Sequence, residues 1–453
     1  MSTGTTYYLG AVVAGFGATL LMDLWALFMK RGCNITSANY GTLATAHYKC
    51  TTPALLRTKM KFHKVLGAVF IFYANGLLAD QTLPSWIREG PYLDNPSASF
   101  EVPIDVVATK MYVNIKIGDN PRRFVVDTGS PSMIDRALVE ELGIKVVDTN
   151  MGRDAHGVVV ETEIVQTNIQ IGGISIQKVP MMSADFSTSI VTKEFVGDGV
   201  LGSDLLPLGA WQLDLKDSVL RFNTNLESLP HIEKSKKLKL YQFGYPYMPI
   251  FDVTYAKRAR SKAMFDTGSP TFFAISSPDL IGSRKASGIG KTVSGYGSPG
   301  SSLGGQAPDA KLLQVELKNL AIDTLNLGRV VAVGRDLSPS LIGAKILERY
   351  VVTLDSRSES AYFEEYADGF FTESSFGFSL AFDKKLSIGA VWEDSPAEAA
   401  GLRAGLELIS INGVDVELTR EGLLSAVKAM EGQEIELVWK DGTARLTRTY
   451  LIQ

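Results

Sequence analysis

Two copies of the sequence Asp-Thr-Gly-Ser, at residues 127–130 and 266–269, carry the clearest chemistry in this chain of 453 residues. Two carboxyl groups held about 3 Å apart cannot both ionise, so they share one proton. One carboxylate can then take a proton from water while its protonated partner polarises a carbonyl oxygen. Asp127 and Asp266 could therefore hydrolyse an amide without a metal ion or a covalent intermediate. A single Asp-Thr-Gly would mean little, because it is also favourable turn chemistry.

The segments around the two aspartates repeat as well. Short apolar runs that are typical of strands, at 124–126 and 263–265, lead directly into the two Asp-Thr-Gly sequences. Further along, Gly202 and Gly343 each follow two apolar residues, at almost equal spacing from the preceding aspartate. The chain therefore contains two copies of a unit of about 120 residues, which indicates an internal duplication. Alternation of Val113, Ile115 and Ile117 with residues 112, 114 and 116 predicts a half-buried strand before the first aspartate.

This arrangement resembles the aspartic proteases of the pepsin-like and retropepsin-like types, with both lobes in one chain. The resemblance implies a mainly β fold, a two-lobed acid-protease β-barrel fold, with lobe 1 at 100–229 and lobe 2 at 240–366. Each lobe would supply one aspartate, and a crossing strand, the psi-loop, would place Gly202 or Gly343 against the aspartate loop. A residue without Cβ permits that close approach.

The resemblance also implies roles for the residues that follow the aspartates. The two threonines would lock the loops together across the lobe interface, and the two serines would bring hydroxyls within reach of the outer carboxylate oxygens. The supporting residues are Thr128, Gly129, Ser130, Thr267, Gly268 and Ser269. A hairpin flap is expected over the site in each lobe, at 152–160 and 294–305, with Tyr296 as a candidate flap tyrosine. The alternative for the second segment is a mobile glycine-rich loop.

Other chemistries have little support in the sequence. No H-E-x-x-H motif or Cys/His cluster is present, so we expect no metal site, and no cofactor motif stands in the right context. Residues 300–304 fit the G-x-S-x-G pattern of serine hydrolases, but no histidine follows, the last being His231. The net charge of −4 and the lack of a dense basic run argue against nucleic acid as a partner.

Residues 370–453 resemble a different module, a PDZ domain of α+β type, closest to those of bacterial periplasmic proteases. The resemblance rests on SPAEAAGLRAG, on ISING and on an amphipathic helix near 420–430. It implies that the backbone N–H groups of Phe376, Gly377 and Phe378 bind a peptide C-terminal carboxylate while the peptide adds as a strand. The alternative is a PDZ domain that packs on the protease and binds no free peptide.

Two apolar segments precede the folded part. Residues 7–29 are long enough to span a bilayer, and residues 60–80 have the layout of a signal peptide. In one interpretation Met60 is the natural start and 1–59 are an N-terminal extension. In the other, hydrophobic helices at 7–29 and 65–79 form a membrane hairpin. Both predict an extracytoplasmic, periplasmic location, with the rest of the chain secreted or membrane-anchored.

Three functions are therefore in view. The leading one is an aspartic endopeptidase that hydrolyses peptide or protein substrates with the Asp127/Asp266 dyad, while the PDZ domain selects them. The second is a catalytically inactive protease-like body that acts as a PDZ adaptor. The third is a membrane protein whose soluble part is accessory.

Overall fold

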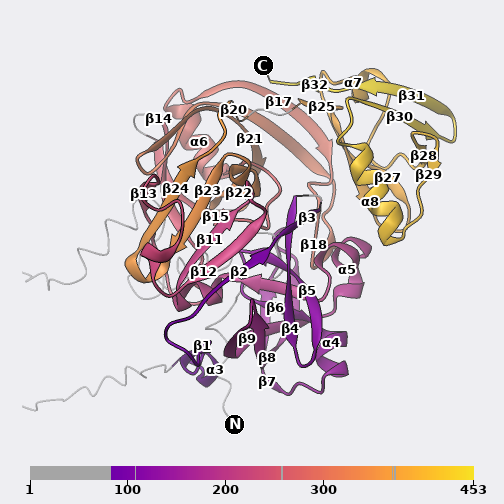
Figure 1. The fold of residues 1–453 in the computed structure, drawn as a ribbon. Coiled ribbons are helices and arrows are strands. Elements are labelled where there is room, and N and C mark those ends of the chain that lie inside the picture. Colours follow the sequence, from indigo (N-terminus) through magenta and orange to yellow (C-terminus); the bar gives the residue numbers. More distant parts are fainter. Residues whose placement is uncertain (1–82, 108, 257–258, 370, 372–373, 453) are drawn as a thin grey trace, which may run out of the picture.

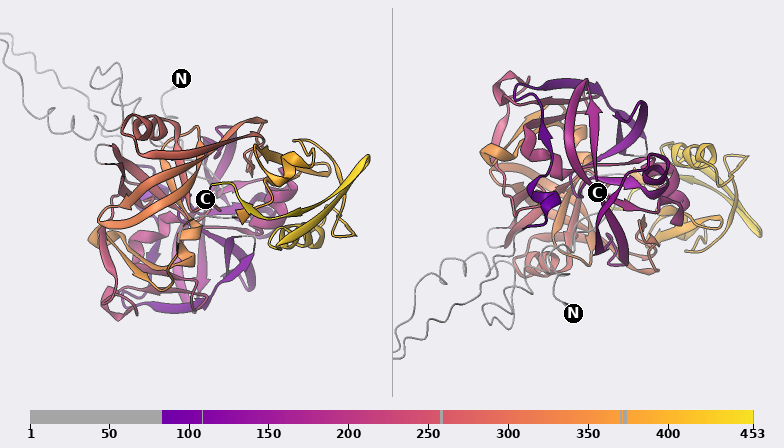
Figure 2. Two further views of the ribbon diagram at one scale, coloured as in Figure 1. Left: turned by 90° about the horizontal axis from the view of Figure 1, so that it is seen from above. Right: turned by 90° about the horizontal axis from the view of Figure 1, so that it is seen from below.

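The computed structural model describes residues 83–107, 109–256, 259–369, 371 and 374–452. The apolar segments at 7–29 and 60–80 therefore lie outside the described residues. In the described part, strands dominate and form two lobes, with a smaller C-terminal domain at one side of them in all three views (Figures 1 and 2). Among these residues no helix is both long and apolar enough to cross a bilayer.

Lobe 1 is built on a nine-stranded sheet that carries Asp127 at the end of β5. Its strands are β1 (Tyr92–Leu93), β3 (Asp105–Val107), β4 (Lys110–Ile117), β5 (Asn120–Asp127), β6 (Met133–Asp135), β7 (Val146–Arg153), β8 (Val159–Ile171), β9 (Ile174–Ala184) and β10 (Gly199–Gly202). Two short helices flank it, α4 (Arg136–Glu141) and α5 (Ile190–Val196), and α3 (Ser85–Arg88) precedes it. The predicted strand before the aspartate is β4, with Val113, Ile115 and Ile117 buried.

A six-stranded sheet joins the lobes, because the last hairpin of each unit pairs with the other along β11 and β23. Its strands are β2 (Ser99–Pro103), β11 (Ala210–Asp214), β12 (Val219–Asn223), β13 (Lys236–Lys239), β23 (Tyr350–Asp355) and β24 (Ser360–Glu365). One apolar cluster runs from lobe 1 through this sheet into lobe 2, and includes Phe222, Leu354 and Phe363. The two lobes therefore share a core.

Lobe 2 and the C-terminal domain share a second nine-stranded sheet. Lobe 2 supplies β14 (Ile250–Ala256), β15 (Ala259–Asp266), β16 (Phe273–Ser276), β17 (Ile289–Gly297), β20 (Ala310–Ile322), β21 (Leu325–Arg335) and β22 (Ser340–Gly343). The C-terminal domain adds β27 (Leu386–Trp392) and β26 (Phe378–Phe382). The junction is antiparallel, with Gly295 opposite Trp392 and Gly297 opposite Ala390. Helix α6 (Ser277–Lys285) starts where the Ser276 side chain accepts the N–H of Asp279.

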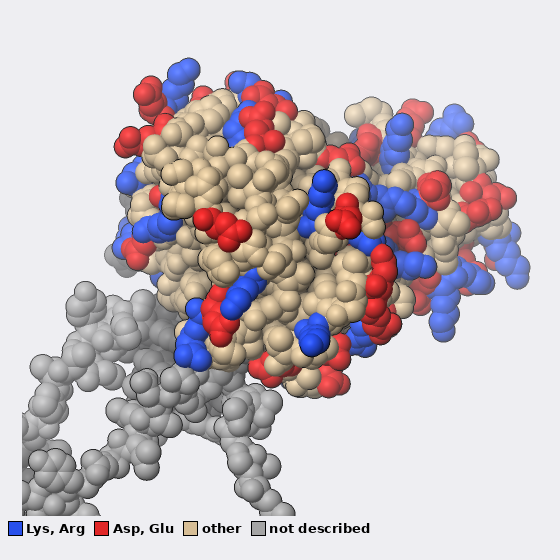
Figure 3. All heavy atoms as spheres, turned by 60° about the horizontal axis from the view of Figure 1, so that its bottom comes forward, with Lys and Arg blue, Asp and Glu red and all other residues tan. Residues whose placement is uncertain are grey.

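The rest of the C-terminal domain forms two further small sheets and two helices. These elements are β25 (Ser374–Ser375), α7 (Pro396–Ala399), β28 (Leu408–Ile411), β29 (Val414–Asp415), α8 (Arg420–Ala429), β30 (Glu434–Trp439), β31 (Gly442–Thr447) and β32 (Thr449–Tyr450). The Thr419 side chain caps α8. Buried residues of α8, among them Leu423 and Ala426, share one apolar cluster with Phe376 and Phe378. On the face in Figure 3, acidic and basic side chains are interspersed, and they are denser over this domain, at the right.

The crossing strands repeat in both lobes. β10 runs parallel to β5 with Gly202 beside Asp127, and β22 runs parallel to β15 with Gly343 beside Asp266. A Cβ at Gly202 would lie 2.2 Å from the backbone N of Ser132, and one at Gly343 would lie 2.0 Å from the carbonyl oxygen of Thr271. Only glycine allows this approach. The structure thus places Gly202 beside Asp127 and Gly343 beside Asp266, as the resemblance implied.

Candidate active site

The two aspartates end equivalent strands and come together at the interface of the lobes. Both side chains are fully buried. The Gly129 N–H donates to Asp127 Oδ1 at 2.9 Å, and the Gly268 N–H donates to Asp266 Oδ1 at 2.9 Å. A Cβ on Gly129 would lie only 2.3 Å from Asp266 Oδ1, which shows how closely one loop approaches the other carboxyl group.

Reciprocal hydrogen bonds between the threonines hold the loops together. The Thr128 hydroxyl donates to the Phe265 carbonyl oxygen at 2.7 Å and accepts the Thr267 N–H at 3.2 Å. The Thr267 hydroxyl donates to the Val126 carbonyl oxygen at 2.9 Å and accepts the Thr128 N–H at 3.1 Å. Four buried bonds therefore set the separation of the two carboxyl groups.

Replacing Thr128 with valine should destabilise the protein, because the isosteric side chain leaves a buried carbonyl and a buried N–H without partners. Each unpaired group costs about 1–3 kcal/mol, so the free energy of unfolding should fall by about 2–5 kcal/mol. Urea unfolding measures this loss. Thr128→Ser keeps the hydroxyl and serves as the control. Equal stability of the valine and serine variants would show that these bonds contribute nothing.

The second oxygen of each carboxyl group has no hydrogen-bond donor among the described residues. Asp127 Oδ2 and Asp266 Oδ2 are buried and receive no hydrogen bond from the described residues. Burial raises the pKa of both carboxyl groups, whereas a hydrogen bond between them lowers the pKa of Asp127 and raises that of Asp266. Burial and the charge of Asp127 raise the pKa of Asp266 to about 8. These effects favour Asp266 over Asp127 as the carboxyl group that would hold a shared proton.

Lys110 is a third charged group at this site, and no sequence pattern predicted it. Its position in the alternation of β4 predicts exposure, yet it is buried, and its ammonium group donates to the carbonyl oxygen of Gly268. Burial lowers the pKa of Lys110, whereas the charges of Asp127 and Asp266 raise it. The Lys110 charge in turn lowers the pKa of both aspartates, against the larger effect of their burial.

The two serines differ in their surroundings. The Ser130 hydroxyl makes no hydrogen bond of ordinary geometry with the described residues, but it lies near enough to lower the pKa of Asp127. The Ser269 hydroxyl lies 3.2 Å from that of Thr271, and it is the Ser269 N–H that donates to Asp266 Oδ1. The expectation that both hydroxyls reach an outer carboxylate oxygen is therefore wrong for Ser269.

The predicted flap segments form hairpins whose ends meet. The turn between β7 and β8 carries Asp154, which accepts hydrogen bonds from the Ser302 hydroxyl and from the Gly304 N–H at 3.0 Å. Ser302 and Gly304 belong to the hairpin of β18 (Ser301–Ser302) and β19 (Gly305–Gln306) in lobe 2. Tyr296 is wrong as a flap tyrosine, because β17 pairs with β27 there and leaves its side chain 60% exposed.

One cluster of side chains contains residue types that can bind a metal cation. Ligand atoms of Asp214, Asp217 and His231 lie within 4.8 Å of one another. However, Arg221 Nη1 lies 2.6 Å from Asp214 Oδ2, and His231 Nδ1 lies 2.7 Å from Glu364 Oε2. The group is therefore explained as an ion-pair network at the central sheet.

The predicted carboxylate-binding loop lies at the start of β26. Phe376 and Phe378 are buried, and Gly377 has φ of 83°. A Cβ at Gly377 would lie 2.0 Å from the Ser395 Cβ, so the loop requires glycine. The Gly377 N–H donates to the Ser375 hydroxyl at 3.2 Å, and the Gly377 carbonyl accepts the Trp392 N–H at 2.9 Å.

Comparison with known proteins supports two modules. An aspartyl protease family model matches residues 113–205, which include Asp127 and Gly202, and a PDZ domain model matches residues 387–441. The Na(+)/H(+) exchange regulatory cofactor NHE-RF2 of Mus musculus is 40% identical over 84 residues, 17% of this chain and 25% of that protein. This chain thus spans about a quarter of the length of that relative.

Two solved structures are also similar. The aspartic proteinase from Irpex lacteus has 13% identity and a TM-score of 0.38, covering 61% of this chain and 99% of that one. Basic 7S globulin from soybean has 10% identity and a TM-score of 0.36, covering 60% and 96%. The family matches confirm the predicted combination of an aspartyl protease region with a C-terminal PDZ domain.

Proposed function

We propose that this protein is an aspartic endopeptidase whose catalytic pair is Asp127 and Asp266. The observation that carries the proposal is the reciprocal threonine lock, which holds two buried carboxyl groups on equivalent loops. The proposed setting is extracytoplasmic, on the ground of the signal-peptide-like segment at 60–80.

In the proposed reaction, a water molecule lies between the two carboxyl groups and the scissile carbonyl. Asp127, as carboxylate, accepts a proton from the water, whose oxygen bonds to the carbonyl carbon. Asp266 donates its proton to the carbonyl oxygen. The C–N bond then breaks as the nitrogen takes a proton from Asp127, while one hydroxyl of the tetrahedral intermediate returns its proton to Asp266 and becomes the C=O of the new carboxyl group. The other product is a new amine. The pair returns to its singly protonated state.

The proposed partner of the PDZ domain is a peptide C-terminus. Backbone N–H groups at Phe376, Gly377 and Phe378 would bind the carboxylate, with that of Gly377 exchanging its bond to the Ser375 hydroxyl for one to the ligand. The edge strand β26 is available for strand addition. The PDZ domain would then select or hold substrates for the protease.

Cleavage of a peptide library by the full chain tests the proposal. We expect cuts at internal peptide bonds that disappear with an aspartic-protease inhibitor and persist with EDTA, because the dyad needs no metal. Mass spectrometry of the products identifies the bonds. Cleavage that EDTA abolishes, or no cleavage at any pH from acid to alkaline, would contradict the proposal.

A further inference from the structure

The edge of the PDZ domain and the catalytic region are parts of one continuous structure. β26 is the last strand of the sheet that begins in lobe 2, reached through the pairing of β17 with β27. The chain end reinforces this junction, since Leu451 and Ile452 pack with Val293 of β17. The edge strand β26 therefore belongs to the same sheet as β15, which ends at Asp266.

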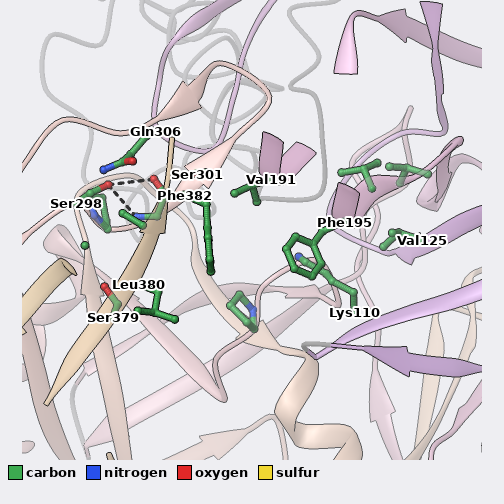
Figure 4. A pocket seen from close by; sticks show the side chains of 17 residues that line it. Lys110, Val125, Val191, Phe195, Ser298, Ser301, Gln306, Ser379, Leu380 and Phe382 are labelled. Atoms are coloured by element: carbon green, nitrogen blue, oxygen red, sulfur yellow. Dashed lines mark hydrogen bonds between the residues drawn. The ribbon is translucent and has the colours of Figure 1, made fainter. Parts of the chain in front are cut away.

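A cavity of about 260 Å³ lies between β26 and the catalytic region. Figure 4 shows Ser379 and Leu380 of β26 on one side, with Phe195 and Lys110 of lobe 1 opposite. Lys110 is the group whose ammonium donates to Gly268, next to Asp266. The cavity thus extends from the PDZ strand to a direct neighbour of the dyad.

In the proposed binding mode, a peptide lies in a groove between β26 and α8, and this groove leads toward the cavity. The carboxylate loop lies at the beginning of β26, and the residues of β26 that line the cavity, 379–382, follow it. Beside them, the N-terminal residue of α8, Arg420, donates to the carbonyl oxygen of Glu194 in α5. Phe195 of α5 packs into the apolar cluster of the PDZ domain. The groove therefore opens, at the end away from the loop, against the α5 wall of the cavity.

We infer that the substrates are polypeptides with a free C-terminal carboxylate, which the PDZ domain holds while the dyad cuts a short distance upstream. This inference rests on the proposed endopeptidase function. A peptide whose carboxylate lies at residues 376–378 runs antiparallel to β26, so its upstream residues pass Leu380 and Phe382 and enter the cavity. The cavity walls are mainly apolar, with Val191, Phe195 and Leu380 among them, so apolar residues should be favoured there.

The geometry implies a fixed number of residues between the bond that is cut and the C-terminus of the substrate. Five residues of β26 pair with about as many residues of an added strand, at about 3.3 Å per residue, and the cavity holds a few more. The cut should therefore lie about six to ten residues before the C-terminus. The distance from the C-terminus, more than the local sequence, should select the bond.

Matched synthetic peptides test the inference with the full chain. One peptide is made as the free acid and as the C-terminal amide, and a third is extended by a short Gly-Ser tail. We expect kcat/KM for the acid to exceed that for the amide at least about tenfold, because the amide lacks the charge that the loop binds. We also expect the cut in the extended peptide to move toward its new C-terminus by the length of the tail.

A variant in β26, compared with a control elsewhere in the PDZ domain, distinguishes loss of peptide binding from unfolding of the domain. Leu380→Glu places a charge between groove and cavity, and should remove the preference, so that the acid and the amide are cleaved at equal rates. Ile409→Glu, at a side chain 52% exposed on β28, is the matched control and should keep the preference. Equal cleavage of acid and amide by the native protein, or a cut that stays in place, overturns the inference but leaves the protease. Absence of any cleavage overturns both.

Discussion

Asp127→Asn and Asp266→Asn should each lower kcat for peptide cleavage by about three to four orders of magnitude. Proton transfer by positioned side chains contributes typically 10²–10⁴-fold, and an amide can neither take the proton of water nor give one to the carbonyl. Asparagine keeps the size of the side chain and the oxygen that accepts the Gly129 or Gly268 N–H. Steady-state kinetics with one fluorogenic peptide, beside circular dichroism for the fold, measures the effect.

Asp204→Asn is the matched control for these variants. Asp204 is also fully buried in lobe 1, and burial raises its pKa to about 7. Its Oδ1 accepts the Ser132 N–H at 2.6 Å, an interaction that asparagine can keep. Its kcat should stay within about threefold of the native value, since it gives no proton to the substrate. If either dyad variant cleaved as well as this control, Asp127 and Asp266 would not be the catalytic pair.

Local sequence pattern accounts for the part of the site that each lobe makes by itself. Two apolar residues before each aspartate and before each crossing glycine marked these positions, and the family resemblance then predicted that Gly202 lies against the Asp127 loop and Gly343 against the Asp266 loop. Such pairs lie within one duplicated unit, so equal spacing reveals them. The threonine lock joins the two units, and its prediction needed the family resemblance.

Contacts that arise from tertiary packing left no such pattern. Tyr112 and Lys110 occupy positions of β4 that alternation assigns to solvent. Tyr112 is buried because its hydroxyl donates to the Phe195 carbonyl oxygen at 2.6 Å, and Lys110 is buried because lobe 2 covers it at Gly268. Tyr296 failed as a flap residue for the same reason, since a strand of another domain pairs with β17. Each outcome depends on a partner more than 80 residues away along the chain.

Lys110→Met should move the pH range of activity toward alkaline pH by about one unit, which is the effect of removing one nearby charge at a partly screened site. The active dyad carries one proton, so activity appears as Asp127 loses its proton and disappears as Asp266 loses the shared one. The Lys110 cation lowers both pKa values, and Arg335 also lowers that of Asp266. In the native protein the alkaline limb should lie near the pKa of Asp266, about 8. Without Lys110, both limbs should rise together.

Two further lysine variants make this test specific to charge at the dyad. Lys110→Arg keeps a cation in β4 and should hold the alkaline limb near its native position. Lys116→Met removes an exposed lysine from the same strand, where solvent screens the charge, and should leave the profile unchanged. The profile of kcat/KM against pH reports the free enzyme, so it isolates the dyad from effects on bound substrate. An alkaline limb in Lys110→Met that coincides with that of the native protein would mean that Lys110 is uncharged beside the dyad and does not set its working pH.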